Sequence, residues 1–383
     1  MGVGLVGVIL GLVLAHDEHL GQRLWANVLM NSFFFLGISV AALFFWTLQY
    51  ATESAYAVAV KRVYEAIAGY LPVGAITLII VLLASSLGFN HIYHWMAHGI
   101  SDPTSEHYDE VIAGKSGYLN LPFFWIRTLA YLGIWYLFYK GFRKRSLQED
   151  LEGGLDIHWK NVKMAAIFLV LYGVTSSTSA WDWLMSIDTH WYSTMFGWYI
   201  FSGTWCSSMI MLILFILFLK SKGYLQQVND SHIHDIGKWM FATSFLWSYL
   251  WFCQFMLIWY ANIPEEITYF QTRFDLYKPV MWTTFFVNFA LPMIFLIARD
   301  AKRNPKFLAV VGCIIFFFHW VDLFQIVMPG TVGAHWYFFN PLELGMFMMF
   351  LGLFLFVVHT QLTKAPLMVK NHPYLDESLH HEF

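Results

Sequence analysis

The residues of this sequence best suited to chemistry are ionisable groups inside long apolar stretches. His319 and Asp322 lie three residues apart within 307–328, so a helix would place both on one face, and Gln325 continues that face. Ionisable groups at membrane depth are costly and usually face a polar interior. Such a pair could relay protons, because a neutral imidazole both accepts and donates a proton and the carboxylate can tune its pKa. The alternative is a hydrogen-bonded pair that only holds helices together.

A second acidic group ends the apolar stretch 162–182. Asp182 follows four consecutive hydroxyl residues at 176–179, and Asp188 and His190 come shortly after it. Hydroxyls in a membrane helix can line a wet channel or satisfy backbone carbonyls in simple packing. Arg127, in the stretch 121–141, needs an anion nearby and could pair with Asp182.

Four further groups are available as proton carriers. Glu343 opens the stretch 342–361, where a carboxylate favours a helix N-terminus. Glu53, Glu65 and His359 fall on the opposite side of the apolar segments. Two basic residues precede Glu65 by about one turn, which favours a surface ion pair over a place in a channel.

The composition indicates what must hold these groups. Of 383 residues, 58% are hydrophobic and 12% charged, whereas a soluble domain carries about 25% charged residues. The chain is therefore predicted to be embedded in a membrane, in contact with lipids. Its three cysteines lack the spacing of zinc, iron-sulfur or haem c sites, and only His319 lies deep enough for a bis-histidine haem. We expect no metal site and no metal cofactor in this chain. A net charge of −3 gives no nucleic-acid footprint.

Ten apolar segments fit, or nearly fit, the roughly 20 residues that a helix needs to cross a bilayer. They are 2–15, which is short, and 27–49, 71–90, 121–141, 162–182, 194–219, 238–261, 279–298, 307–328 and 342–361. Most Lys and Arg residues fall in the connections on one side and in the C-terminal tail. Because basic loops stay in the cytoplasm, both termini are predicted to be cytoplasmic.

The middle eight segments repeat local signatures in the same order. Trp-x-Ala stands at 95–97 and again at 259–261, and Pro122 and Pro279 open matching segments. The pattern predicts an all-α integral membrane protein with two four-helix bundles, related as a parallel repeat, and two flanking helices. The expected divisions are 1–26 for the first helix and loop, 27–190 and 191–330 for the bundles, and 331–383 for the last helix and tail.

Three stretches carry a resemblance to a known family. They are 25–31 (Trp-Ala-Asn-Val-Leu-Met-Asn), 61–66 (Lys-Arg-Val-Tyr-Glu-Ala) and 181–186 (Trp-Asp-Trp-Leu-Met-Ser), the last followed by Trp-Tyr-Ser-Thr at 191–194. The chain resembles, over nearly its whole length, the second of the two large quinol-oxidoreductase membrane subunits of bacterial alternative complex III. Those subunits belong with the NrfD-like membrane subunits of polysulfide reductase.

The resemblance implies a complex in the bacterial cytoplasmic membrane that oxidises menaquinol or ubiquinol. Electrons would pass to iron-sulfur clusters and haem c in periplasmic partner subunits, and on to cytochrome c or a terminal oxidase. A homologous sister membrane subunit would be a further partner. This chain would supply a proton path, with Asp182 and Asp322 at acidic positions in the outer half. His91, His94, Arg127 and Asp182 would line any quinone-facing cavity.

Two other classes of function are also consistent with the sequence. One is a secondary transporter built on a helical repeat. Transporter helices are often broken by Gly or Pro at mid-membrane, whereas Pro122, Pro279 and Pro292 lie mostly near helix starts, which argues against transport. The other is a purely structural subunit of the complex.

Overall fold

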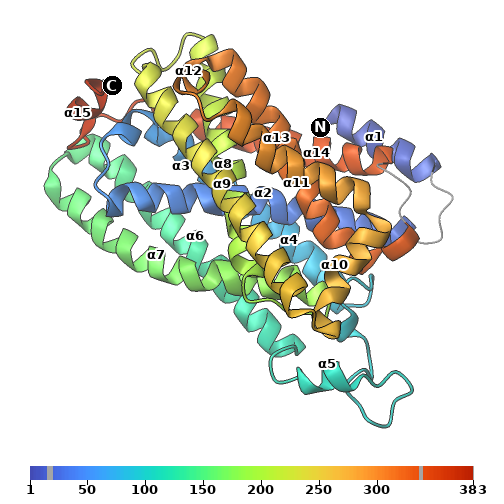
Figure 1. The fold of residues 1–383 in the computed structure, drawn as a ribbon. Coiled ribbons are helices and arrows are strands. Elements are labelled where there is room, and N and C mark those ends of the chain that lie inside the picture. The colour runs from blue at the N-terminus through green and yellow to red at the C-terminus, as the bar shows by residue number, and fades with distance from the viewer. Residues whose placement is uncertain (15–19, 336–339, 383) are drawn as a thin grey trace.

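The computed structural model describes residues 1–14, 20–335 and 340–382, which are helical and contain no β-strand (Figure 1). The first half contains α1 (Gly2–Leu14), α2 (Leu20–Ala51), α3 (Lys61–Ala68), α4 (Leu71–Ser86), α5 (Glu110–Gly114), α6 (Leu121–Glu152) and α7 (Leu155–Trp183). The second contains α8 (Phe196–Ser221), α9 (Asp230–Ala261), α10 (Pro264–Leu276), α11 (Lys278–Phe295), α12 (Arg299–Arg303), α13 (Pro305–Thr331), α14 (Pro341–Leu362) and α15 (Leu375–Leu379). Short 3-10 turns are η1 (Tyr56–Val60), η2 (His94–Met96), η3 (Met185–Ile187) and η4 (Gly333–His335).

Within the described residues, eight helical spans are long and apolar enough to cross a membrane. They are α2, the continuous stretch Tyr56–Ser86 made of η1, α3 and α4, and then α6, α7, α8, α9, α13 and α14. The prediction of an all-α membrane protein is therefore confirmed. Two of the ten expected spans differ: α1 has 13 residues, and the 18 residues of α11, which include Lys278 and Asn288, are less apolar than the eight.

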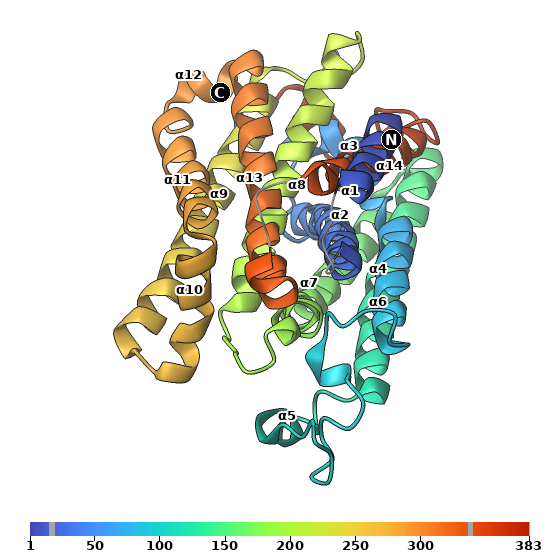
Figure 2. The ribbon, with the colours of Figure 1, turned by 90° about the vertical axis from the view of Figure 1, so that its right-hand side faces the viewer.

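Eight long helices form two rings of four, and the two rings are in contact through α2. In the first ring α2, α4, α6 and α7 contact one another in turn, and in the second α8, α9, α11 and α13 do so. The helix α2 also contacts α8 and α13, and Figure 2 shows α2 nearly end-on between the two rings. This is the two-bundle arrangement expected from the sequence, and the repeat relation between the bundles stays a prediction.

The helix α2 is buried along most of its length. It approaches α8 closely at Gly37, where an added Cβ would lie 2.6 Å from the Thr204 Cγ2. Its Asn31 Oδ1 accepts a hydrogen bond of 3.0 Å from the Trp320 Nε1 of α13. Small residues and buried amides hold membrane helices together, since lipid offers no hydrophobic drive for their association.

The flanking helices α1 and α14 pack against each other through their backbones. An added Cβ at Gly4 would lie 2.4 Å from the Met349 backbone nitrogen, and one at Gly345 would lie 2.5 Å from the Val8 nitrogen. Only glycine permits this approach.

Glu343 fixes the start of α14. It accepts a hydrogen bond of 2.6 Å from the Arg23 Nε of α2 and one of 2.8 Å from the Asn340 backbone nitrogen. Glu343, expected among the proton carriers, thus serves the helix N-terminus and an ion pair.

The short helices α5 and α15 lie at opposite ends of the molecule (Figure 1). We call the end that carries α5 the α5 end, and the opposite end, which carries α15, the α15 end (Figure 1).

Candidate functional site

The second ring encloses a carboxylate, Asp322, that forms no ion pair within the described residues, although Arg273 is close enough to interact with it electrostatically. Asp322, 4% exposed, accepts hydrogen bonds from the Tyr199 hydroxyl, from the Trp247 Nε1 at 3.0 Å and from the Gln325 Nε2 at 3.0 Å. All three donors are neutral. The site can therefore hold a charged carboxylate without fixing the charge by an ion pair.

His319 lies one turn before Asp322 on α13 and is 2% exposed. Neither ring nitrogen has a hydrogen-bond partner among the described residues. The imidazole packs edge-on against the Trp247 ring, with 5.4 Å between the ring centroids. The expected direct contact between His319 and Asp322 is not formed: Trp247 touches both, through its ring and its Nε1.

A proline in α13 creates the binding place for a buried arginine. Pro329 has no N–H, so the carbonyl of Gln325, four residues earlier, lacks its usual helical donor. The Arg273 Nε of α10 donates to that carbonyl at 3.0 Å, and its Nη2 donates to the Ile326 carbonyl at 3.1 Å. The guanidinium also stacks on the Tyr269 ring, 3.3 Å from its centroid. Arg273 therefore joins α10 to the stretch of α13 that follows Asp322.

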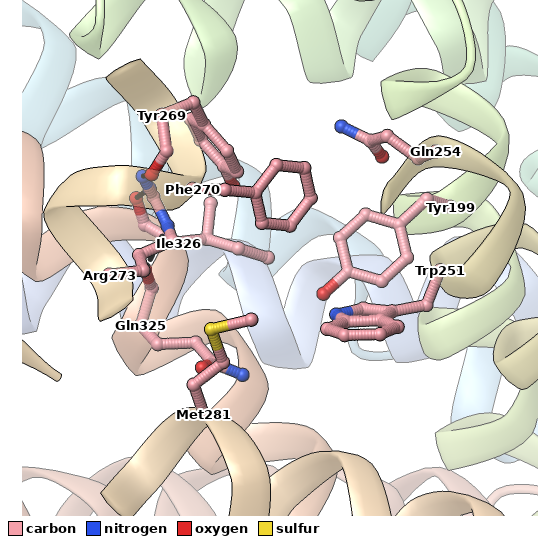
Figure 3. A pocket seen from close by; sticks show the side chains of 9 residues that line it. All are labelled: Tyr199, Trp251, Gln254, Tyr269, Phe270, Arg273, Met281, Gln325 and Ile326. Atoms are coloured by element: carbon pink, nitrogen blue, oxygen red, sulfur yellow. Dashed lines mark hydrogen bonds between the residues drawn. The ribbon is translucent and has the colours of Figure 1, made fainter. Parts of the chain in front are cut away.

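Two cavities lie between the α5 end and the neighbourhood of Asp322, with Tyr269 and Arg273 in the lining of both. The inner cavity, about 20 Å³, has room for roughly one water molecule. Its lining residues are Tyr199, Trp251, Gln254, Tyr269, Phe270, Arg273, Met281, Gln325 and Ile326 (Figure 3). The outer cavity, about 270 Å³, is lined by His94, Ile187, Asp188, Thr189, His190, Trp191, Thr268, Tyr269, Thr272, Arg273 and Pro329. Because Tyr269 and Arg273 line both, they separate a polar entrance from two of the donors to Asp322.

Two predicted proton carriers lie at this entrance. Asp188 accepts a hydrogen bond of 3.4 Å from the Arg273 Nη2. The His190 Nε2 lies 2.7 Å from the Asp109 Oδ2. Backbone donors at the start of α5, chiefly the Ile112 N–H, lower the pKa of Asp109. The entrance thus carries titratable groups at the surface and a fixed cation below them.

The first ring holds its buried carboxylate differently. Asp182, fully buried, accepts hydrogen bonds of 2.8 and 2.9 Å from the Arg127 Nε and Nη2, and one of 3.0 Å from the Tyr131 hydroxyl. The Arg127 guanidinium stacks on the Tyr118 ring, 3.8 Å from its centroid. The predicted pairing of Arg127 with Asp182 is confirmed. Such a bidentate pair neutralises the carboxylate and ties α6 to α7.

Of the four residues expected to line a quinone-facing cavity, only Arg127 and Asp182 contact each other. His94 lies in the outer cavity beside Asp188. His91 is exposed, and its backbone nitrogen donates to the Gln22 Oε1 at 3.1 Å. The structure thus assigns His94 to the entrance of the second ring.

The remaining predicted carriers lie at the α15 end. Glu65 is 1% exposed and pairs with Arg62 at 2.6 Å and with Arg143, so the ion pair is confirmed but its surface position is wrong. The exposed Glu53 accepts a hydrogen bond of 3.1 Å from the Tyr374 hydroxyl. The His359 Nδ1 donates to the Leu355 carbonyl at 2.7 Å, and its ring lines an apolar cavity of about 420 Å³ between α8, α13 and α14.

Only part of this site could be predicted from the sequence. The prediction did not include Arg273, Tyr199, Trp247 or Tyr269. A usable signal was Pro329, which directly follows the apolar stretch 307–328, because a freed carbonyl in a membrane helix requires a donor from elsewhere.

No protein-family model matches this sequence, and no curated protein matches it.

Proposed function

We propose that this chain is a proton-conducting membrane subunit of a quinol-oxidising respiratory complex of the alternative complex III type. The observation that supports proton conduction is Asp322, a buried carboxylate with neutral donors only, placed behind a polar entrance at the α5 end. An ionisable group at such a depth, with no ion-pair partner in the part of the chain that the structure describes, is suited to gain and lose a proton.

The geometry supports a sequence of proton positions. A proton reaches the outer cavity, where Asp188 and His190 can exchange it with water. A water molecule that entered the inner cavity would lie beside Tyr199 and Gln325 and would bring the proton within reach of Asp322. His319, whose two ring nitrogens have no hydrogen-bond partner among the described residues, is the next acceptor along α13.

Arg273 and the size of the inner cavity limit which ions can pass. The Arg273 guanidinium lines both cavities and is held by two backbone carbonyls and the Tyr269 ring. Its fixed positive charge raises the electrostatic barrier for every cation, an excess proton included. The inner cavity, about 20 Å³, has room for about one water molecule, so a hydrated sodium or potassium ion does not fit, whereas a proton can move along the hydrogen bonds of a single water.

The rest of the proposal rests on the sequence resemblance and the distribution of charge. The complex lies in the bacterial cytoplasmic membrane, both termini of this chain are cytoplasmic, and the α5 end is periplasmic. Iron-sulfur clusters and haem c belong to periplasmic partner subunits, beside a sister membrane subunit and a terminal oxidase or cytochrome c. The outer cavity at His94 is where a menaquinone or other quinone head group would meet this chain.

The test compares matched variants in the purified complex. Asp322→Asn and His319→Ala should leave assembly and haem content intact and lower the number of protons translocated per electron in reconstituted vesicles. Asp275→Asn, which removes an exposed carboxylate two residues from Arg273, is the control and should leave that ratio unchanged. An unchanged ratio in both buried-site variants would refute the proton path. Purification of this chain without haem c or iron-sulfur subunits would refute the assignment to the complex.

A further inference from the structure

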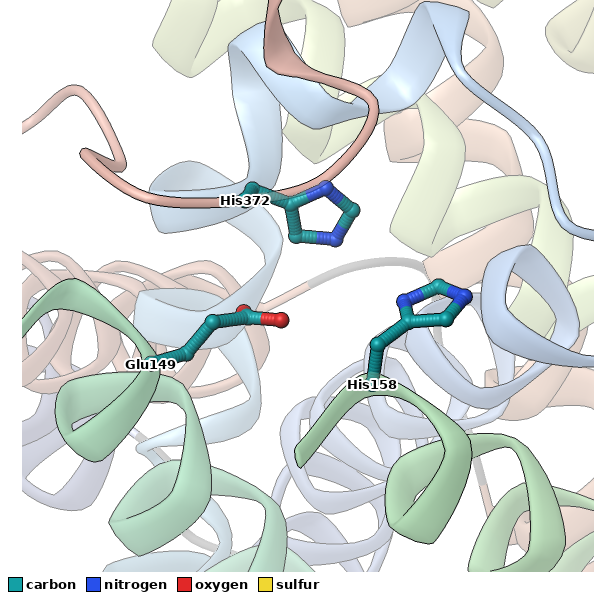
Figure 4. A group of neighbouring side chains, drawn as sticks. All are labelled: Glu149, His158 and His372. Atoms are coloured by element: carbon teal, nitrogen blue, oxygen red, sulfur yellow. The ribbon is translucent and has the colours of Figure 1, made fainter. Parts of the chain in front are cut away.

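Three metal-ligating side chains meet at the α15 end, away from the proton path. They are Glu149 near the end of α6, His158 in the first turn of α7 and His372 in the C-terminal tail (Figure 4). One potential ligand atom from each lies within 4.8 Å of the other two, and all three residues are buried. In Figure 4 the carboxylate and the two imidazoles point into one common space.

The chain is built so that these side chains converge. Gly153 and Gly154, with φ values of 65° and 88°, form the sharp turn that brings the end of α6 beside the start of α7. The Asp150 Oδ1 accepts a hydrogen bond of 3.0 Å from the Lys370 backbone nitrogen, and the Asp150 carbonyl accepts one of 2.9 Å from the Asn371 Nδ2. These two hydrogen bonds hold residues 370 and 371 of the tail over the turn. The next residue of the tail, His372, is thereby placed beside Glu149 and His158.

The converging groups have unused polar atoms. Both ring nitrogens of His158, which is 2% exposed, and the Oε1 of Glu149, which is 1% exposed, lack hydrogen-bond partners in the described part of the chain. The Tyr374 backbone nitrogen donates to the His372 Nδ1 at 3.2 Å, so the Nε2 of the neutral ring carries the proton and would bind a metal ion only in the other tautomer, with loss of this long hydrogen bond. Each unsatisfied buried polar group costs about 1–3 kcal/mol. A bound partner that takes several of these atoms at once would remove that cost.

We propose that Glu149, His158 and His372 form a site for a divalent transition-metal ion, with Zn²⁺ as the best fit. Two imidazoles and one carboxylate are a donor set that zinc accepts, whereas calcium and magnesium prefer oxygen ligands. Bonds of about 2.0–2.1 Å in a tetrahedral site require donor atoms about 3.3 Å apart, so small side-chain rotations would close the site around the ion. A small adjoining cavity, lined in part by Tyr50 and Lys61, has room for about one water molecule as the fourth ligand.

The neighbouring charges decide which ions can bind. The Lys61 Nζ donates to the Glu149 Oε2 at 2.7 Å and leaves the other oxygen free. This cation weakens purely electrostatic attraction for a metal ion. Ions that form strong bonds to imidazole nitrogen are therefore favoured over hard cations.

A metal at this place would fasten the tail to the membrane helices. Beyond His372, the tail reaches both rings: the Ala59 backbone nitrogen of η1 donates to the Ser378 Oγ at 3.1 Å, and the His381 Nε2 lies 2.6 Å from the Asp235 Oδ2 of α9. The site would thus anchor the first part of a strap that covers the α15 end. It requires no part of the proposed proton path.

The experiment uses the full chain purified without chelators. Elemental analysis should find about one equivalent of zinc, and protein stripped with EDTA should bind one equivalent of Co²⁺ with the strong visible absorption of a tetrahedral site. His158→Ala and His372→Ala should each lower Co²⁺ affinity at least tenfold. His380→Ala, which alters an exposed histidine of the same tail, should bind Co²⁺ as the unmodified chain does.

A second readout separates metal binding from folding. Zn²⁺ should slow protease cleavage of the tail in the unmodified chain and in His380→Ala, and should have no effect on His372→Gln, whose helix content by circular dichroism is expected to be unchanged. The proposal is refuted if the stripped chain binds no Co²⁺. It is equally refuted if the histidine variants bind Co²⁺ as tightly as the control, because the ion would then be held elsewhere.

Discussion

The two buried aspartates should lose stability to very different extents on the same substitution. Asp182→Asn and Asp322→Asn each replace a carboxylate by an amide of nearly equal size. In the first ring the substitution leaves the Arg127 guanidinium, 8% exposed, without its anion. In the second ring the three donors to Asp322 are neutral, so no charge is left behind.

The magnitudes follow from these contacts. Removing one partner of a buried ion pair costs about 3–5 kcal/mol, and the slight exposure of Arg127 points to the lower part of that range. At Asp322 the amide loses hydrogen bonds but also removes the cost of burying a carboxylate without a counter-ion, so we expect a net loss of about 1 kcal/mol or less. Asp182→Asn should therefore be less stable than Asp322→Asn by at least about 2 kcal/mol.

The assay is reversible unfolding of the full chain in mixed micelles with increasing SDS, followed by tryptophan fluorescence and helix content. Arg127→Met combined with Asp182→Leu should recover part of the loss, because no charge then stays buried alone. Asp275→Asn, at an exposed position, should change the free energy of unfolding by about 0.5 kcal/mol or less. If Asp322→Asn proves as destabilising as Asp182→Asn, Asp322 is a structural group and the distinction between the two sites fails.

Three further outcomes can be measured on the same chain. Pro329→Ala restores an N–H that can donate to the Gln325 carbonyl, so the cost of Arg273→Met should be about 1 kcal/mol smaller in that background, as measured by a double-mutant cycle of unfolding free energies. Gly345→Leu should separate α14 from α1 and cost about 1–3 kcal/mol, because its Cβ would meet the backbone of α1, and a loss of cysteine cross-linking between these helices would report it. Burial lowers the pKa of His372 to about 2, below its usual value near 6.5. The imidazole of the undocked tail is therefore protonated at a pH at which the docked imidazole stays neutral. In chelator-treated protein, docking of the tail should weaken as the pH falls below about 6.5 and should be unaffected above that pH. Faster proteolysis of the tail at low pH would report the weaker docking.

Much of the fold could be predicted because it depends on local composition. Apolar stretches of about 20 residues coincide with the long helices, and eight of them are long and apolar enough to cross a membrane. The exceptions have local causes. The 13 residues of α1 are too few, and α11 includes a lysine, an asparagine and Pro292.

The site was less predictable because partners come from distant parts of the chain. Arg127 and Asp182 could be matched because each needs an opposite charge at the same depth. Arg273 could not be placed, since its main acceptors are backbone carbonyls of α13. His319 and Asp322 share a helix face, but spacing alone does not show that the Trp247 indole touches both of them.

The same reasoning explains the missed group at the α15 end. Glu149 and His158 are close in sequence, but His372 reaches them only because the tail folds back over the turn between α6 and α7. Glu65 was expected at the surface because basic neighbours usually indicate water. In the folded chain α6 supplies Arg143 and Ser146 and closes over it.

The central position of α2 has a consequence for biogenesis. This helix is synthesised long before Trp320 and Glu343, which bind its Asn31 and Arg23 with sequence separations of 289 and 320 residues. Until α13 and α14 have been synthesised, α2 stays in lipid or beside an insertase, and its Asn31 and Arg23 side chains lack these two partners. The nascent chain therefore cannot mature helix by helix, and products that stop before α13 should be recognised by membrane quality control and degraded.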